Sequence, residues 1–175
     1  MSTEPLPKTL DVRKAAARGV SVQGALKPLE LQRFLGLLSE EDGEISVMLQ
    51  FARNEENHYL VNVVVEAEVF VECQRCLESM PLKLVAENSL AAVWTDEEAR
   101  HLPRYVDPLI TGEACDLWRL AEDELILALP AFNNHADEHC NKILAGLAQS
   151  DPSLGSEFEK PNPFDVLAQL KPGKK

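Results

Sequence analysis

The sequence predicts an α+β fold: an antiparallel β-meander of about three to five strands, packed by two or three helices. Apolar and polar residues alternate along 45–51, 59–73 and 82–94, which is the period of a strand with one buried face. The segments 29–38 and 117–129 repeat their apolar residues every three or four positions, as amphipathic helices do. Short polar turns separate the strands, so consecutive strands are expected to pair as neighbours.

The strand at 59–73 fixes the register of the expected sheet. Its odd positions are apolar, whereas its even positions include Glu66, Glu68 and Glu72. A slip of one residue would bury these glutamates, so the pairing is strongly specified and the glutamates are expected on a solvated face. A further short strand is expected at 21–27.

The helix at 117–129 has the clearest boundaries in the sequence. Asp116 is expected to cap its N-terminus, and Pro130 ends it. The segment 96–112 before this helix is acidic, and we expect it to be an irregular connection with a short strand near Leu109.

The chain is expected to have three parts. Residues 1–20 form a basic, weakly structured lead-in, residues 21–144 a single α+β domain, and residues 145–175 a flexible linker that ends in a short helix. The first part of this tail is rich in Gly, Ser, Asp and Glu, which is typical of a linker. Asn162 fits the N-cap of the terminal helix and Pro163 its first position.

The 175 residues carry a net charge of −12 at pH 7, and this charge is unevenly placed. Residues 1–38 hold six basic and three acidic side chains, and the last five residues add three lysines, which leaves −18 for the body between them. Such a body repels phosphate backbones, which argues against broad nucleic-acid binding and favours a basic protein as partner. In most acidic proteins, however, the excess of acid only maintains solubility.

No stretch of the sequence has the features of a signal peptide, and none has the apolar length that spans a bilayer. We therefore expect a cytoplasmic protein whose four cysteines stay reduced. No membrane and no small-molecule substrate is expected as a partner.

Cys73 and Cys76 form the clearest chemical motif, a Cys-x-x-Cys at the end of a strand. This spacing lets two thiolates bind one metal ion, and His135 with Cys140 could complete the four ligands of one structural zinc. His139 is the alternative to His135, but it directly precedes Cys140, and adjacent side chains usually diverge. Two other interpretations stay open: a metal-free reduced pair kept for packing or partner contact, and a thioredoxin-like redox pair.

The sequence contains no nucleophile elbow, P-loop, GxGxxG or HExxH motif, and we expect no enzymatic activity. If the protein binds nucleic acid, the expected contacts are Gln74 and Arg75 at the tip of the cysteine loop and the basic arm at 8–18.

Several strings of residues resemble one protein family. The string at 71–77, Val-Glu-Cys-Gln-Arg-Cys-Leu, is similar to the cysteine loop of the YceD family, the large ribosomal RNA subunit accumulation proteins. The strings at 116–130 and 160–164, together with His135 and Cys140, resemble the proteobacterial members of that family.

The resemblance implies a factor needed for the synthesis, processing or stability of 23S ribosomal RNA, with no known catalytic activity. The expected partner is a basic ribosomal protein or an rRNA-processing factor on the pre-50S particle, with Asn162, Pro163 and Phe164 of the tail as further contacts. The alternative is a direct RNA-binding zinc-knuckle protein. Related sequences carry cysteines where this chain has His135 and Cys140, which supports a metal site because Cys and His both bind zinc well.

Overall fold

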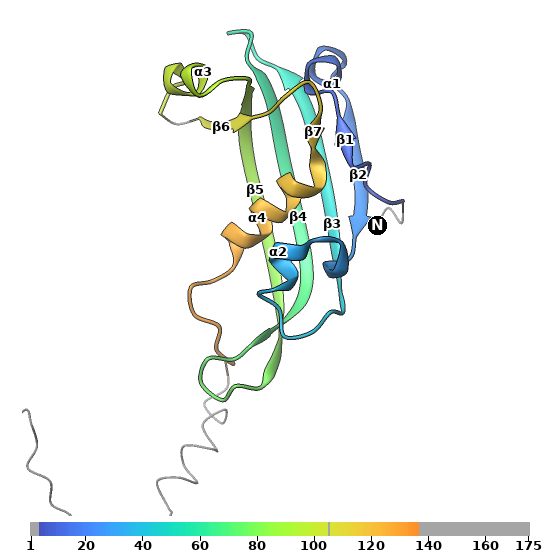
Figure 1. Cartoon of the computed structure of the whole chain (residues 1–175), viewed down its shortest axis with the longest axis vertical. Coiled ribbons are helices and arrows are strands. Elements are labelled where there is room, and N and C mark those ends of the chain that lie inside the picture. Colours follow the sequence, from blue (N-terminus) through green and yellow to red (C-terminus); the bar gives the residue numbers. More distant parts are fainter. Residues whose placement is uncertain (1–3, 105, 137–175) are drawn as a thin grey trace, which may run out of the picture. The chain divides into compact units, whose positions relative to one another are not determined.

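A five-stranded sheet with helices packed on one face organises the chain (Figure 1). The computed structural model describes residues 4–104 and 106–136. The α+β class predicted from the sequence is confirmed. The strands lie in the order β2-β3-β4-β5-β6, and their bounds are Ser21–Leu26, Gly43–Arg53, Tyr59–Glu72, Ser79–Val93 and Asp107–Ile110.

The strands β2 to β5 form the predicted antiparallel meander. In β4 the odd positions from Val61 onward are buried, and the glutamates at even positions are exposed as predicted. The strand expected near Leu109 is confirmed as β6, but it pairs with β5 in parallel. A parallel pair needs a crossover connection, and the segment between β5 and β6 supplies it with helix α3 (Asp96–His101), which the sequence analysis did not predict.

Helix α1 (Val12–Arg18) lies in the lead-in that was expected to be weakly structured, so that expectation is wrong. The Asp11 carboxylate accepts a hydrogen bond from the Lys14 backbone N–H at the start of the helix. Gly19 ends the helix in the left-handed region, with φ +60°. The helix is short and rich in alanine, so it shows little periodicity, yet its apolar face packs on β3 and β4.

Helix α2 is shorter than the helix predicted at 29–38. A 3-10 turn at Pro28–Glu30 comes first, and α2 itself comprises Gln32–Leu35. Leu31 interrupts the helix with φ −117° and ψ 85°, although it is buried like Phe34. The helical spacing of the apolar residues therefore predicted their burial, but not the length of the helix.

Helix α4 (Leu117–Ala128) begins and ends close to its predicted boundaries. Asp116 caps it as expected, because its carboxylate accepts hydrogen bonds from the backbone N–H groups of Trp118 and Arg119. The helix lies across β4 and β5 (Figure 1). Four of its apolar side chains enter the core, namely Leu117, Leu120, Ala121 and Leu125.

The N-terminal arm before α1 closes one side of this core. Leu6 is 2% exposed and lies over Gly24 of β2, where an added Cβ would be 2.5 Å from the Leu6 Cα. Further along the arm, β1 (Thr9–Leu10) pairs with β7 (Cys115–Asp116). The arm therefore connects the edge of the sheet to the start of α4.

The tail predicted at 145–175 lies outside the described residues, and the predicted boundaries of the three parts stay a prediction. Among the described residues, no helix combines the length and the apolar character that crossing a membrane requires.

Candidate functional site

The loop between β4 and β5 folds into a tight knuckle that presents two cysteines. The Cys73 N–H donates to the Glu78 carbonyl at 2.9 Å, and the Leu77 N–H donates to the Cys73 carbonyl at 2.8 Å. Leu77 adopts φ +63°, a left-handed conformation that residues other than glycine rarely take. This reversal of the chain places the side chains of Cys73 and Cys76 next to each other, and both residues are buried.

A hydrogen bond joins the knuckle to the segment that follows α4. The Gln74 N–H donates to the Asn133 carbonyl at 2.8 Å. This contact brings in His135, whose Nδ1 lies 3.5 Å from the Cys76 Sγ. In Figure 1 the segment after α4 runs toward the loop between β4 and β5. The structure thus brings together three of the four ligands considered for zinc.

The three donor atoms have the spacing of a metal site. The thiol sulfurs of Cys73 and Cys76 and a ring nitrogen of His135 all lie within 4.8 Å of one another. Zinc bonds of about 2.3 Å to sulfur and 2.0 Å to nitrogen at a tetrahedral angle place the two donors about 3.5 Å apart. The Cys76–His135 distance of 3.5 Å agrees with that value. This group could therefore hold a metal ion, while Cys140 and His139 lie outside the described residues.

The electrostatics of the knuckle favour the thiolate form of Cys73. Burial would raise the pKa of this thiol, but the backbone N–H groups of His135, Cys76 and Arg75 outweigh burial and lower the pKa from 9.0 to about 5. The thiolate is the form that binds metal ions. Cys115 differs, because its burial in the core raises its pKa.

The tip of the knuckle is exposed and carries both polar and apolar side chains. Gln74 and Arg75, the predicted partner contacts, are exposed there. Leu77 is 70% exposed, and Phe132, in the segment that joins the knuckle, is 77% exposed. The tail contacts predicted at 162–164 lie outside the described residues.

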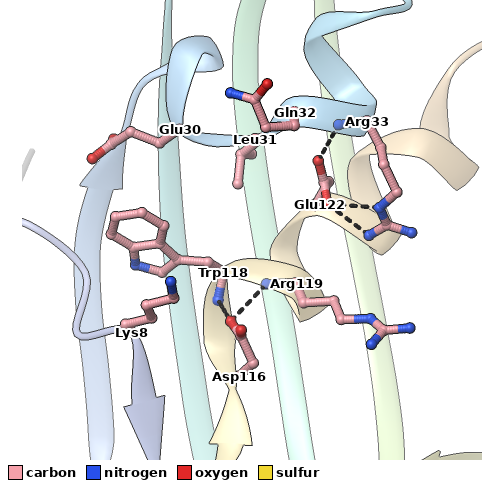
Figure 2. A pocket seen from close by; sticks show the side chains of 9 residues that line it. All are labelled: Lys8, Glu30, Leu31, Gln32, Arg33, Asp116, Trp118, Arg119 and Glu122. Carbon is pink, nitrogen blue, oxygen red and sulfur yellow. Dashed lines mark hydrogen bonds and ion pairs between the residues drawn. The ribbon is translucent and has the colours of Figure 1, made fainter.

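A pocket of about 380 Å³ lies between the N-terminal arm, α2 and α4 (Figure 2). The Trp118 ring forms one wall, and its Nε1–H donates to the Leu6 carbonyl at 2.9 Å. The Lys8 ammonium lies 5.5 Å from the centre of the same ring, within the range of a cation–π contact. This pocket is not predicted by the sequence, because Lys8 and Trp118 are far apart in the chain.

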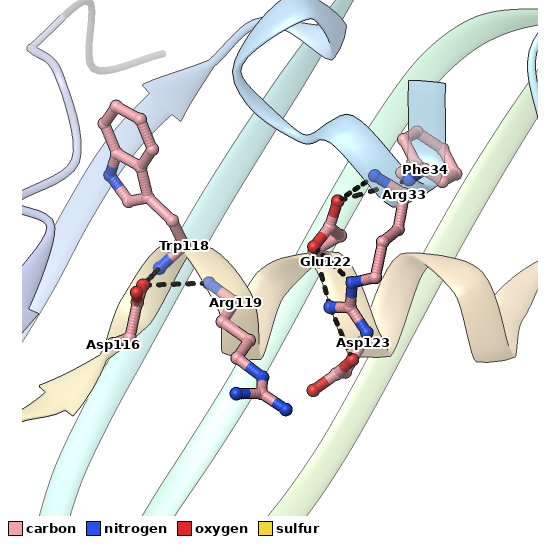
Figure 3. A network of polar contacts seen from close by, with 7 residues as sticks. All are labelled: Arg33, Phe34, Asp116, Trp118, Arg119, Glu122 and Asp123. Carbon is pink, nitrogen blue, oxygen red and sulfur yellow. Dashed lines mark hydrogen bonds and ion pairs between the residues drawn. The ribbon is translucent and has the colours of Figure 1, made fainter. Parts of the chain in front are cut away.

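The carboxylates that line this pocket are held by structural hydrogen bonds, which Figure 3 draws for Asp116 and Glu122. Glu122 accepts from the backbone N–H groups of Arg33 and Phe34 at 2.7 and 3.2 Å and from the Arg33 guanidinium at 2.7 and 2.8 Å. Asp116 caps α4, and Glu30 accepts from the Lys27 N–H at 2.7 Å. The Glu122 contacts attach α2 to α4, and no sequence signal pairs residues that lie 89 positions apart.

Comparison with known proteins places the chain in a family. The family model described as "Large ribosomal RNA subunit accumulation protein YceD" matches residues 61–171. A curated protein of Haemophilus influenzae with the same name is 33% identical over 174 residues, which cover 98% of this chain and 99% of that protein. The chain belongs to the YceD family. The region that matches the YceD model contains most of β4, the knuckle, β5 and α4, so the resemblance seen in the sequence is confirmed. No solved structure matches the chain.

Proposed function

We propose that this YceD-family protein supports the accumulation of 23S ribosomal RNA as a non-catalytic binding protein. The observation that carries the proposal is the similarity to the Haemophilus protein along almost the whole of both chains. A match of that extent includes the knuckle and the core, so both chains are expected to share one fold and one role. The protein is expected to act in the cytoplasm, where the large subunit is assembled.

The arrangement of the polar groups supports binding over turnover. In the described residues the carboxylates of the pocket cap helices or pair with Arg33, so none of them is poised as a general acid or base. Catalysis would need such a group within reach of a substrate and near its working pKa. Turnover of a purified 23S rRNA precursor by the protein alone would contradict this part of the proposal.

For the knuckle we propose one structural zinc, bound by Cys73, Cys76 and His135 with Cys140 as the fourth ligand and His139 as the alternative histidine. The donor types and the 3.5 Å spacing support it. The ion would fix the knuckle to the segment after α4. It would thereby present Arg75 and the neighbouring side chains in one orientation.

The proposed partner is a basic ribosomal protein or an rRNA-processing factor of the large subunit. Gln74 and Arg75 of the knuckle and Asn162, Pro163 and Phe164 of the tail would supply specificity. Pull-down of the full chain and of a form without residues 161–175 tests this assignment. We expect ribosomal or RNA-processing proteins with the full chain and fewer with the shortened one, and their absence from both would contradict it.

Direct binding of RNA is the second candidate, and the exposure of Arg75 at the knuckle tip favours it. It predicts an affinity that falls steeply with salt, because each phosphate contact releases counterions. It also predicts weaker binding by the Arg75→Ala variant. A dissociation constant that does not change with salt would exclude this candidate.

The cellular role is tested by deleting the gene and measuring the ratio of 23S to 16S rRNA. We expect the ratio to fall and to recover when the wild-type gene is restored. Recovery with Cys73→Ser would assign the role to a part of the protein other than the knuckle. An unchanged ratio in the deleted strain would overturn the proposed function.

A further inference from the structure

Within residues 4–104 and 106–136, one face of the sheet carries no packed helix over its central part. Helices α1, α2 and α4 all contribute to the single core on the opposite face. The even-numbered residues of β3 and β4 and the odd-numbered residues of β5 point away from that core, since the register pairs these positions with one another. We call this surface the open face.

The centre of the open face is apolar and hollowed. Met48 pairs directly with Val64 across β3 and β4. Both residues line two hollows, of about 590 Å³ and 190 Å³, that lie on either side of them. Val85 stands nearby on β5 and is 68% exposed. Met side chains adapt their shape to a partner, which suits a surface that receives a flexible segment.

Acidic side chains lie on the border of this apolar centre. Glu66 lines the smaller hollow and Glu87 the larger one. The three strands place five exposed glutamates on the open face against one exposed lysine, Lys83, which pairs with Glu68. The open face therefore carries an excess of negative charge.

The register also sets two like charges directly opposite each other. Glu44 of β3 is the cross-strand partner of Glu68 of β4, and both are exposed. Like charges in this position are destabilising, because their Cβ atoms are only about 5 Å apart. A cation bound between them would relieve that repulsion, and Lys83 offers a single charge for the pair.

We propose that the open face is the docking surface for a lysine- and arginine-rich segment of a protein. The aliphatic stems of such side chains would lie on Met48, Val64 and Val85. Their cationic ends would reach Glu66, Glu87 and the Glu44–Glu68 pair. Lysine and arginine are the side chains that match an apolar centre with an acidic border.

The same surface disfavours nucleic acid, because phosphates would meet the glutamates. The inference rests on the proposed function for the source of the partner, which would be a basic protein of the large ribosomal subunit. The docking chemistry itself follows from the open face alone.

The test compares two variants of the full chain that have the same net charge. One removes open-face carboxylates, with Glu44→Gln, Glu66→Gln and Glu87→Gln. The matched control carries Glu55→Gln, Glu97→Gln and Glu113→Gln, which are exposed and lie outside the open face. The first probe is a short labelled peptide that alternates lysine and alanine, and the second is the RNA-free protein extract of purified large subunits.

We expect the open-face variant to bind the peptide at least about tenfold more weakly than the wild type, and the control to differ by about twofold or less. Equal weakening in both variants, or in neither, would overturn the docking surface. Binding of a labelled 23S rRNA fragment that is lost only in the open-face variant would also overturn it, in favour of nucleic acid.

The two probes separate this inference from the proposed function. Open-face-dependent capture of an identified large-subunit protein from the extract supports both. Open-face-dependent binding of the peptide with no large-subunit protein captured supports the docking surface and contradicts the proposed source of the partner. Capture of large-subunit proteins that both variants retain fully contradicts the docking surface and leaves the proposed function in place.

Discussion

Two glutamates of α4, separated by a single residue, show how strongly local contacts determine the pKa of a buried carboxylate. Glu122 and Glu124 are each 7% exposed. Burial would raise the pKa of Glu122, but the hydrogen bonds from Arg33 and Phe34 outweigh burial and lower it. Burial raises the pKa of Glu124. Its hydrogen bond from Asn88 is 3.4 Å long, and the nearby charges of Asp107 and Asp123 raise the pKa further. The first carboxylate therefore stabilises the fold when charged, and the second destabilises it.

Replacing Glu122 with Gln should lower the free energy of unfolding at pH 7 by about 2 kcal/mol, because charge-assisted hydrogen bonds become neutral ones. Urea titration followed by circular dichroism measures this. Glu124→Gln is the matched control, and at the same pH we expect it to leave stability unchanged or to raise it. Equal destabilisation by both substitutions would contradict the distinction between the two sites.

The contributions of Glu122 and Glu124 to the free energy of unfolding should change in opposite directions as the pH falls. The pKa of Glu122 lies below its ordinary value of 4.5 in the folded protein, so its contribution is present above pH 4.5 and is lost as the pH falls through the folded pKa. The charged Glu124 carboxylate destabilises the fold, and this destabilisation is relieved as the pH falls through its raised pKa. Urea midpoints measured from pH 7 downward should therefore fall less steeply for Glu122→Gln than for the wild type. Parallel curves would contradict this assignment.

The Leu6 backbone lies so close to position 24 that only a glycine fits there. An alanine Cβ there would lie 2.5 Å from the Leu6 Cα and 2.6 Å from the Leu6 nitrogen, so the N-terminal arm would have to move. We expect Gly24→Ala to cost about 1–3 kcal/mol and to change the fluorescence of Trp118, whose indole donates to the Leu6 carbonyl. Gly112→Ala is the control, since no atom lies within 4 Å of its added Cβ. Unchanged fluorescence and stability in Gly24→Ala would contradict the role of the arm.

At the scale of elements, the sequence predicted the structures that have long periodic patterns. The alternation along 59–73 predicted β4 and its buried face, and Asp116 marked the start of α4. Helices α1 and α3 were missed because each spans at most two turns, where caps determine the helix more than periodicity does. The parallel pairing of β6 follows from the path of the connection, and a local pattern carries no information about that path.

The proposed zinc gives a prediction about the knuckle as a structural element. We expect one zinc per chain by elemental analysis, lost in Cys73→Ser. Chelator should lower the unfolding temperature of the wild type and have little effect on that variant, because a structural zinc contributes on the order of 10 kcal/mol to folding. Cys115→Ala is the control, since Cys115 lies in the core, and it should keep its zinc. A wild type with no zinc and no response to chelator would refute the site.

At the scale of the whole molecule, the sequence predicted an acidic body between basic ends, but not the face of the fold on which the acidic side chains gather. The charge of −18 in that body is compatible with an even distribution over its surface. Only the strand register places five glutamates on one face and sets Glu44 opposite Glu68. The candidate metal site was likewise predicted only in part, because one of its contacts depends on the fold. The spacing of Cys73 and Cys76 is local, whereas the proximity of His135 depends on where α4 directs the chain.

The charge on the open face should make stability depend on salt. Raising the concentration of sodium chloride shortens the range of repulsion between exposed charges, to about 8 Å at physiological ionic strength. We therefore expect the unfolding temperature of the wild type to rise with salt. The Glu44→Gln, Glu66→Gln, Glu87→Gln variant should respond less than the Glu55→Gln, Glu97→Gln, Glu113→Gln variant. Identical salt responses would show that the repulsion is spread over the whole surface.

The contact between Cys76 and His135 has a consequence for the order of folding. These residues are 59 positions apart, so a metal ion that joined them would close a loop of that length. Closing such a loop in the unfolded chain costs about 4 kcal/mol of conformational entropy. The ion would thus be acquired efficiently only after α4 has docked on the sheet and brought the histidine near. Metal uptake would then be a late step of folding that occurs only after the core has formed.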